Sequence, residues 1–271
     1  MMLSNSGLPL ITLTSPGAVA FHIFNWPIRW YGVFVALGFL IGYLFAERLI
    51  NKYSDRITLS LRHFHDLVFW ILIFSIVFAR LYFVILSWNY FKDHLNEIPR
   101  IWYGGQSVHG GILGAVIAAL LYTGIKKISF YKYMDIIALV FPLGQAIGRW
   151  GNFFNNEAFG KPIQNGLMRL YIPQEFRPEQ YIDDKYFHPT FLYESFLDFV
   201  IFVFLYKKYN LWKEKPGKIF WVYLSSYSLI RFFLEFLRVD SIYLFGSISS
   251  AHIASTIIIL VSSIALIKMR R

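Results

Sequence analysis

Two stretches of this 271-residue chain, 101–125 and 241–267, contain no Lys, Arg, Asp or Glu at all. An α-helix needs about 20 mostly apolar residues to cross a hydrocarbon core about 30 Å thick, so each stretch is long enough to span a membrane. The composition agrees, because 56% of the residues are hydrophobic and only 15% are charged, against about 25% charged residues in soluble domains. We therefore expect a polytopic membrane protein. A soluble globular domain, a disordered chain and, since Cys is absent, a disulfide scaffold are excluded.

Five further segments are apolar but shorter, or are interrupted by charge. The run from Trp30 to Ala46 is just long enough to span, and the run from Leu67 to Phe91 carries Arg80 in its middle. The other three reach spanning length only if they include charged residues. The sequence therefore predicts an all-α fold, with about seven transmembrane helices in a single integral membrane domain over residues 1–271. The helices are expected near 30–48, 67–88, 109–125, 135–151, 189–206, 218–237 and 250–268.

The lysines and arginines outside these helices are unevenly distributed. With the N-terminus outside, the segments that face inside hold 15 of the 26 Lys and Arg residues, and the outside segments hold 6. Because cytoplasmic loops are enriched in Lys and Arg, this imbalance predicts an N-out, C-in orientation. It also accounts for the net charge of +10 without a nucleic-acid partner. The longest outside connection, 152–188, is expected to fold as a small extracytoplasmic cap.

Five arginines fall within or beside the predicted spans: Arg29, Arg80, Arg149, Arg231 and Arg238. A charge at such a position is costly, so each is a functional hypothesis by default. The alternative is that the side chain extends along the helix and places its charge at the membrane surface. For Arg29 and Arg80 both interpretations stay open.

The segment Gly148–Gly160 ends the fourth predicted span with glycines, asparagines and a glutamate in close succession. Glycines let other groups approach the backbone, and asparagines both donate and accept hydrogen bonds. Arg149 offers a planar set of five N–H donors that suits a phosphate. The pattern favours an anion-binding function. The alternative is a capped helix end with an ion pair between Arg149 and Glu157.

The sixth predicted span places four polar residues on one helical face, at i, i+4, i+8 and i+11. They are Tyr227, Arg231, Glu235 and Arg238. Glu235 can pair with either arginine, which lowers the cost of burying it. The face is then expected to keep one guanidinium for an anion. A purely structural ladder of ion pairs is the alternative.

His109 and Tyr31 each begin a predicted span. An imidazole can remove a proton near neutral pH, and the two glycines after His109 would let a bulky substrate reach it. A structural histidine is the alternative. Tyr31 is interpreted as an aromatic residue at the outer membrane surface, and His188 and Glu194 as structural residues that could support the site.

All of these candidates lie at the outer ends of predicted spans. A transport path would need polar groups at the membrane midplane and on the inner side as well. The one-sided distribution therefore favours an enzyme that acts on outer-leaflet lipid or on exported polypeptide. No metal site is expected, because His63 and His65 have no third partner. Close helix packing is predicted at three pairs of glycines four residues apart: Gly38/Gly42, Gly110/Gly114 and Gly144/Gly148.

Together these motifs resemble those of the bacterial prolipoprotein diacylglyceryl transferases. The pattern Gly-Arg-x-Gly-Asn-Phe-x-Asn-x-Glu-x-x-Gly, from Gly148 to Gly160, is similar to the signature of that family. The remaining motifs appear in the family's order: Trp30-Tyr31-Gly32, His109-Gly110-Gly111, His188-Pro189-Thr190 with Tyr193-Glu194, and Arg231 through Glu235 to Arg238.

The resemblance implies an enzyme of the bacterial inner membrane with its active site on the periplasmic side. It would move the diacylglyceryl group of phosphatidylglycerol onto the thiol of a lipobox cysteine in an exported preprolipoprotein. The products would be a thioether and glycerol 1-phosphate, in the first step of lipoprotein maturation. No cofactor and no metal is implied. The absence of Cys fits, because the substrate brings the sulfur.

On this basis Arg149 and Arg231 are expected to hold the phosphate and to stabilise charge as it leaves. His109 either takes the thiol proton or only orients the thiol. The residues assigned to substrate binding are Tyr31, Arg149, Asn152, Glu157, Gly160, Tyr227, Glu235 and Arg238. Two competing interpretations are a lipid or solute transporter with an anion site in its outer vestibule, and an assembly factor whose arginines bind phospholipid.

Overall fold

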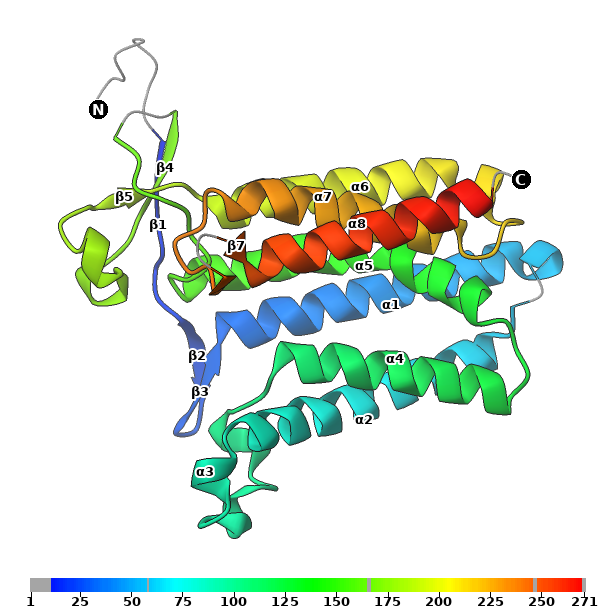
Figure 1. Ribbon diagram of the computed structural model, residues 1–271, viewed down its shortest axis with the longest axis horizontal. Helices are drawn as coiled ribbons and strands as arrows, with labels where there is room; N and C mark the ends of the chain where they lie inside the picture. Colours follow the sequence, from blue (N-terminus) through cyan, green and yellow to red (C-terminus); the bar gives the residue numbers. More distant parts are fainter. Residues whose placement is uncertain (1–10, 58, 165–166, 246–247, 270–271) are drawn as a thin grey trace. The chain divides into compact units, whose positions relative to one another are not determined.

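The computed structural model describes residues 11–57, 59–164, 167–245 and 248–269 (Figure 1). Helices dominate this part of the chain. They are α1 (Trp30–Ile57), α2 (Leu61–Leu86), α3 (Trp88–Phe91), α4 (Val108–Ile125), α5 (Phe130–Phe154), α6 (Thr190–Trp212), α7 (Lys218–Glu235) and α8 (Ser250–Lys268). Single 3-10 turns lie at Leu95–Glu97, Ile101–Tyr103, Gln174–Phe176 and Glu179–Tyr181. All seven predicted spans coincide with long helices.

Four of these helices are long and apolar enough to cross a membrane. They are Trp30–Tyr53 of α1, together with α2, α4 and α8. The other three, α5, α6 and α7, carry charged residues within their apolar stretches. The structure is therefore that of a mostly helical, multi-pass membrane protein.

The described chain divides into two compact units. The first comprises residues 1–48 and 135–271, and the second comprises residues 49–134. In the first unit α7 packs along α8 and against α6 (Figure 1). In the second unit α2 packs along α4.

Helix α8 carries its apolar side chains on the outside. Ile257, Leu260 and Ile264 are exposed, whereas the two fully buried positions are Ser255 and Ser262. Small residues let neighbouring helices approach each other in a membrane, while lipid solvates the apolar face. This distribution is what a lipid-exposed helix requires.

Glycines let α2 and α4 approach closely in the second unit. A Cβ atom on Gly110 would overlap the carbonyl oxygen of Phe78, and one on Gly114 would overlap that of Phe74. In the first unit, a Cβ on Gly38 of α1 would lie 2.7 Å from the carbonyl oxygen of Gly144 in α5. The predicted packing role is confirmed for these positions, but Gly148 has no atom near its would-be Cβ.

Arg80 has a structural environment in the second unit. Its side chain is buried and donates hydrogen bonds of 2.7–2.9 Å to four backbone carbonyls, those of Glu97, Ile98, Gly104 and Gly105. Its guanidinium carbon also lies 5.1 Å from the ring centroid of Phe91. Arg80 therefore fixes the loop that leads into α4.

The all-α prediction missed seven short strands. They are β1 (Ile11–Thr14), β2 (Val19–Ile23), β3 (Trp26–Arg29), β4 (Met168–Tyr171), β5 (Tyr186–Phe187), β6 (Tyr243–Phe245) and β7 (Ile248–Ser249). β2 pairs with β3 and β6 pairs with β7, both antiparallel. Strands this short leave little alternation in the sequence, which explains the omission.

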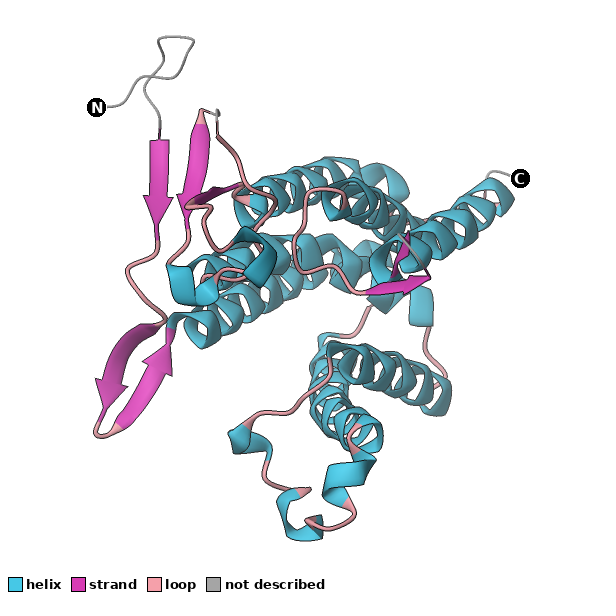
Figure 2. Cartoon of the chain, turned by 60° about the vertical axis from the view of Figure 1, so that its left-hand side comes forward, coloured by secondary structure: helices cyan, strands magenta, loops and turns pink. Residues whose placement is uncertain are grey.

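β1, β4 and β5 form one sheet at the end of the first unit's helices (Figure 2). β1 runs parallel to β4, from Ile11 opposite Met168 to Thr14 opposite Tyr171, and β5 pairs antiparallel to β4. A buried apolar cluster lies beneath this sheet: Phe153, Phe159, Leu170, Ile172, Phe187 and Phe191. Within 152–164 and 167–188 the structure thus places β4 and β5, which form one sheet with β1 from near the N-terminus, and the extracytoplasmic cap stays a prediction.

Candidate functional site

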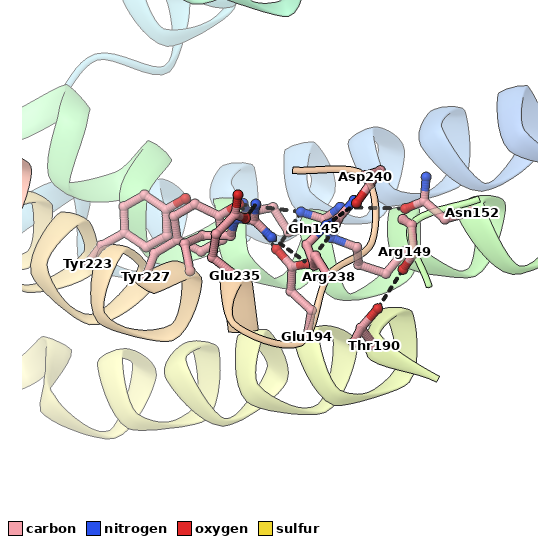
Figure 3. A network of polar contacts seen from close by, with 12 residues as sticks. Gln145, Arg149, Asn152, Thr190, Glu194, Tyr223, Tyr227, Glu235, Arg238 and Asp240 are labelled. Carbon is pink, nitrogen blue, oxygen red and sulfur yellow. Dashed lines mark hydrogen bonds and ion pairs between the residues drawn. The ribbon is translucent and has the colours of Figure 1, made fainter. Parts of the chain in front are cut away.

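Three arginines of the first unit lie within 4.0 Å of one buried carboxylate, that of Glu194, and two of them, Arg149 and Arg238, are labelled in Figure 3. Arg149 forms a close ion pair with Glu194 Oε1. On the other oxygen, Oε2, Arg231 Nη1 lies at 3.6 Å and Arg238 Nη1 at 3.9 Å. Glu194 is only 1% exposed, so these charges meet away from bulk water. We call Arg149, Arg231, Arg238 and Glu194 the guanidinium cluster.

Helix ends bring the cluster together. Arg149 lies near the end of α5, Glu194 near the start of α6, and Arg231 near the end of α7. Ser195 donates a 2.7 Å hydrogen bond to the carbonyl of Ala146, which fixes α6 against α5. α6 follows α5 in the chain and precedes α7, and it runs in the opposite direction to both. The end of α5, the start of α6 and the end of α7 therefore lie at the same end of the first unit, where Arg149, Glu194 and Arg231 meet.

Asp135, at the opposite end of α5, fixes the position of α7. Its carboxylate accepts hydrogen bonds of 2.7 and 2.8 Å from the backbone N–H groups of Gly217 and Phe220. N–H groups in the first turn of a helix have no partner inside the helix, so a carboxylate there stabilises the helix start.

Two of the arginines have further carboxylate partners. Arg231 Nη2 lies 3.0 Å from Glu235 Oε2, and Arg238 donates two hydrogen bonds of 2.8 and 2.5 Å to Asp240. Burial alone would raise the pKa of Asp240, but the fork of hydrogen bonds from Arg238 lowers it below its ordinary value. Each arginine of the cluster therefore has a carboxylate partner, and the excess positive charge expected from the sequence is not present.

One donor of the cluster nevertheless has no acceptor. Arg231 Nη1 is buried and makes no hydrogen bond, and Glu194 Oε2, 3.6 Å away, accepts none. Buried donors are nearly always satisfied in folded proteins. This free N–H donor lies beside two further guanidinium groups, so an oxygen of a bound anion could accept a hydrogen bond from it.

Two tyrosines of α7 line the cluster (Figure 3). The Tyr227 hydroxyl lies 3.3 Å from both Arg149 Nη2 and Glu194 Oε1, accepting from the first and donating to the second. Its ring stacks on that of Tyr223, whose hydroxyl donates a 2.8 Å hydrogen bond to Gln145. Tyr227 of the predicted face therefore contacts both Arg149 and Glu194. Arg238, however, lies beyond the end of α7 at Glu235, so the prediction that all four residues share one helical face is wrong for Arg238.

The segment after Arg149 forms its own polar chain. Asn152 accepts a 3.5 Å hydrogen bond from Arg149 Nη1 and donates a 2.8 Å hydrogen bond to Glu157. Asn155 donates to the same Glu157 oxygen at 3.3 Å. Arg149 thus pairs with Glu194 and reaches Glu157 only through Asn152, so the alternative of a direct Arg149–Glu157 ion pair does not hold.

Gly160 and Tyr31 are held by close packing. A Cβ on Gly160 would lie 2.8 Å from side-chain atoms of His188 and Thr190, and its N–H donates to the His188 carbonyl at 2.9 Å. A Cβ on Gly151 would lie 2.9 Å from the ring of Tyr31. A side chain at position 160 or position 151 would therefore overlap its neighbours, which explains the glycine at each. The contact with Gly151 also places Tyr31 over the end of α5.

His188 fits its structural interpretation. Its Nδ1 lies 3.3 Å from the Tyr193 hydroxyl, and its backbone N–H donates to the carbonyl of Lys161 at 3.1 Å. Burial lowers the pKa of His188 below its ordinary value, which favours the neutral imidazole.

His109 belongs to the second unit. It lies in the first turn of α4, its side chain is exposed, and its ring stacks on that of Tyr82 with 6.4 Å between the centroids. The structure thus links most of the predicted binding residues of the first unit to the guanidinium cluster. Tyr31 and Gly160 instead contact Gly151 and His188, and His109 lies in the second unit.

The sequence pattern indicated only a supporting role for Glu194 and did not single out Asp240 or Asp198 as residues of the site. Asp198 lies one turn beyond Glu194 in α6, fully buried, with no hydrogen bond to either carboxylate oxygen. The signal was present in the chain, because a carboxylate within an apolar span points to a buried cation nearby. Which of the arginines it meets depends on how the helices pack.

Comparisons with known proteins identify the family. A family model described as prolipoprotein diacylglyceryl transferase matches residues 18–268. A phosphatidylglycerol–prolipoprotein diacylglyceryl transferase of Staphylococcus xylosus is 40% identical over 266 residues, which cover 96% of this chain and 92% of the relative. A protein of the same name from Staphylococcus aureus is 40% identical over 258 residues, covering 93% of this chain and 88% of the relative. Since the match extends over nearly the whole chain, this protein belongs to the prolipoprotein diacylglyceryl transferase family and is an enzyme of that class.

Proposed function

We propose that this enzyme transfers the diacylglyceryl group of phosphatidylglycerol to the lipobox cysteine of exported preprolipoproteins. The observation that carries the proposal is the guanidinium cluster with its free donor, Arg231 Nη1, because that arrangement can accept a phosphate oxygen. The names of the relatives supply the lipid and the protein substrate.

The reaction is a displacement at the glycerol carbon that carries the phosphate. The cysteine sulfur forms a C–S bond, the C–O bond to the phosphate breaks, and glycerol 1-phosphate leaves with the electron pair. The thiol proton goes to a base or to the departing phosphate. This chain has no Cys of its own, in keeping with a nucleophile that arrives with the substrate.

Arg149 and Arg231 act on the phosphate in this scheme. They bind it in the ground state and stabilise the second negative charge that develops as the C–O bond breaks. Glu235 supports them through its ion pair with Arg231, and Arg238 supports them from its place beside Glu194. A planar guanidinium suits this task better than an ammonium group because it can bind two phosphate oxygens at once.

The remaining predicted residues shape the substrate site. Asn152, Glu157 and Gly160 form the wall next to Arg149, and Tyr31 and Tyr227 position lipid or peptide. Their contacts with Arg149, with the end of α5 and with His188 support this assignment.

His109 is proposed to act on the thiol, either as its base or as the group that orients it. A thiol is only a few per cent thiolate at neutral pH, so help of this kind raises the rate. A His109→Gln variant is expected to transfer the diacylglyceryl group more slowly than wild type. An unaltered rate would remove His109 from the mechanism and leave the reaction itself intact.

The enzyme is proposed to lie in the bacterial inner membrane as a single seven-span domain, N-out and C-in. The 152–188 cap and the guanidinium cluster would then face the periplasm, where exported proteins arrive. Two points support this arrangement: a long helix at each predicted span, and the positions of Arg149 and Arg231 near the ends of α5 and α7, from which the chain continues toward the cap strands and the β6–β7 connection.

A transfer assay tests the function. Purified full-length protein is mixed with phosphatidylglycerol labelled in its acyl chains and with a lipobox peptide. One thioether-linked peptide and one glycerol 1-phosphate should form per turnover, and a peptide with Ser in place of the lipobox Cys should stay unlabelled. If no covalent product forms and lipid moves across vesicle membranes instead, the proposed transfer function is refuted in favour of transport.

A further inference from the structure

Glu194 has a different relation to each arginine of the cluster. Through Oε1 it pairs closely with Arg149 and accepts from the Tyr227 hydroxyl. Through Oε2 it faces Arg231 and Arg238 at 3.6 and 3.9 Å without a hydrogen bond. One oxygen is thus fully engaged and the other is not.

The three arginines also differ in whether they have a second carboxylate partner besides Glu194. Arg231 has Glu235 and Arg238 has Asp240 as a second carboxylate partner. Among the ion pairs of the described chain, Arg149 has Glu194 alone. Removing the charge of Glu194 would therefore free Arg149 the most, while Arg231 and Arg238 would keep a partner.

The open side of Glu194 lies where an anion would bind. Arg231 Nη1 lacks an acceptor there, and Arg238 Nη1 approaches the same oxygen. A phosphate oxygen accepted by these two groups would come close to the Glu194 carboxylate. Two negative charges at such a separation repel each other strongly in a buried site.

We propose that Glu194 is a positioning residue that fixes Arg149 through Oε1 and, through the charge on Oε2, limits how tightly the arginines hold a phosphate. This inference rests on the proposed function. The leaving glycerol phosphate carries more negative charge than the phosphodiester of the lipid, so the repulsion acts mainly on the product. Glu194 thereby helps the product to leave.

The proposal predicts a specific kinetic pattern for Glu194→Gln, which keeps the shape and removes the charge. The kcat should fall about 10- to 100-fold, because Arg149 loses its fixed geometry and small misplacements cost about that much. The KM for phosphatidylglycerol should not rise. The inhibition constant of added glycerol 1-phosphate should fall several-fold, because the competing carboxylate is gone.

Two further variants separate positioning from simple loss of fold. Glu194→Asp keeps the charge on a shorter stem, so its kcat should be intermediate and its inhibition constant should stay within about twofold of wild type. Ser195→Ala removes the neighbouring hydrogen bond to Ala146 without touching an arginine. It should lower the melting temperature, and its inhibition constant should stay at the wild-type value because the charge of Glu194 is kept.

The measurements are steady-state transfer kinetics per folded enzyme, with glycerol 1-phosphate as the inhibitor. Wild-type kinetics in Glu194→Gln, or the same pattern in Glu194→Gln and Ser195→Ala, would overturn the proposal. If Glu194→Gln does not fold, the Glu194→Asp variant alone tests the proposal. A wild-type kcat in Glu194→Asp would then overturn it. A wild-type enzyme without transfer activity would instead refute the proposed function, and this inference with it.

Discussion

At the scale of single residues, the sequence singled out the three arginines of the cluster but not the partner that they share, Glu194. Arg149, Arg231 and Arg238 stood out because a charge inside an apolar span is rare. Their pairing with Glu194 depends on three helices meeting, and nothing local in the chain specifies that contact. The i, i+4 spacing of Arg231 and Glu235, by contrast, made their ion pair predictable.

Asp240 gives a residue-scale prediction about pH. The lowered pKa of Asp240 means that its ion pair with Arg238 stabilises the fold at neutral pH. That contribution is complete above the unfolded-state pKa, near 4, and is lost as the pH falls through the lower folded-state pKa. Asp240→Asn should therefore melt at a lower temperature than wild type at pH 7, and the difference should shrink in strong acid.

The expected size of this effect is modest. The Asp240 side chain is 49% exposed, so solvent screening limits the contribution to less than about 1 kcal/mol. Thermal unfolding in detergent at several pH values measures it. A difference between the two proteins that grows on acidification would contradict the assignment.

At the scale of helices, the apolar runs located each helix but not its full length. α2 begins at Leu61 and α6 continues to Trp212, beyond the predicted 67 and 206. Hydrophobicity marks the part of a helix that lies in lipid, whereas backbone hydrogen bonds extend the helix into the polar interface. The short strand β1 escaped prediction because it pairs with β4, which lies far along the chain.

The close packing of α2 against α4 predicts how glycine substitutions act. Gly114→Ala should destabilise the protein by about 1–3 kcal/mol, because its Cβ would overlap the Phe74 carbonyl and the backbone of α2 has to move. Gly124, on the same helix, has open space around its would-be Cβ. Gly124→Ala should be neutral or stabilising, since alanine favours helix. Equal melting temperatures for the two variants would contradict this account of the interface.

At the scale of the whole molecule, orientation in the membrane is predicted from charge alone. The absence of Cys makes it directly testable, since a single introduced thiol is the only one in the chain. Asp183 in the cap and Lys208 near the end of α6 are both exposed. In whole cells, an impermeant thiol reagent should label Asp183→Cys and should label Lys208→Cys only after the membrane is opened. The reverse pattern would invert the predicted topology.

We propose above all that the guanidinium cluster binds the phosphate of the lipid substrate. The most direct measurement compares diacylglyceryl transfer by wild type, Arg149→Ala and Arg169→Ala at equal amounts of folded protein. Arg169 is the matched control. Its guanidinium lies over the ring of Tyr186 and its Nε donates a hydrogen bond to Thr12, so it contacts neither residue of the Arg149–Glu194 pair. We expect Arg149→Ala to lose transfer, by at least about 100-fold, and Arg169→Ala to retain it. Full activity in a folded Arg149→Ala enzyme would contradict the claim.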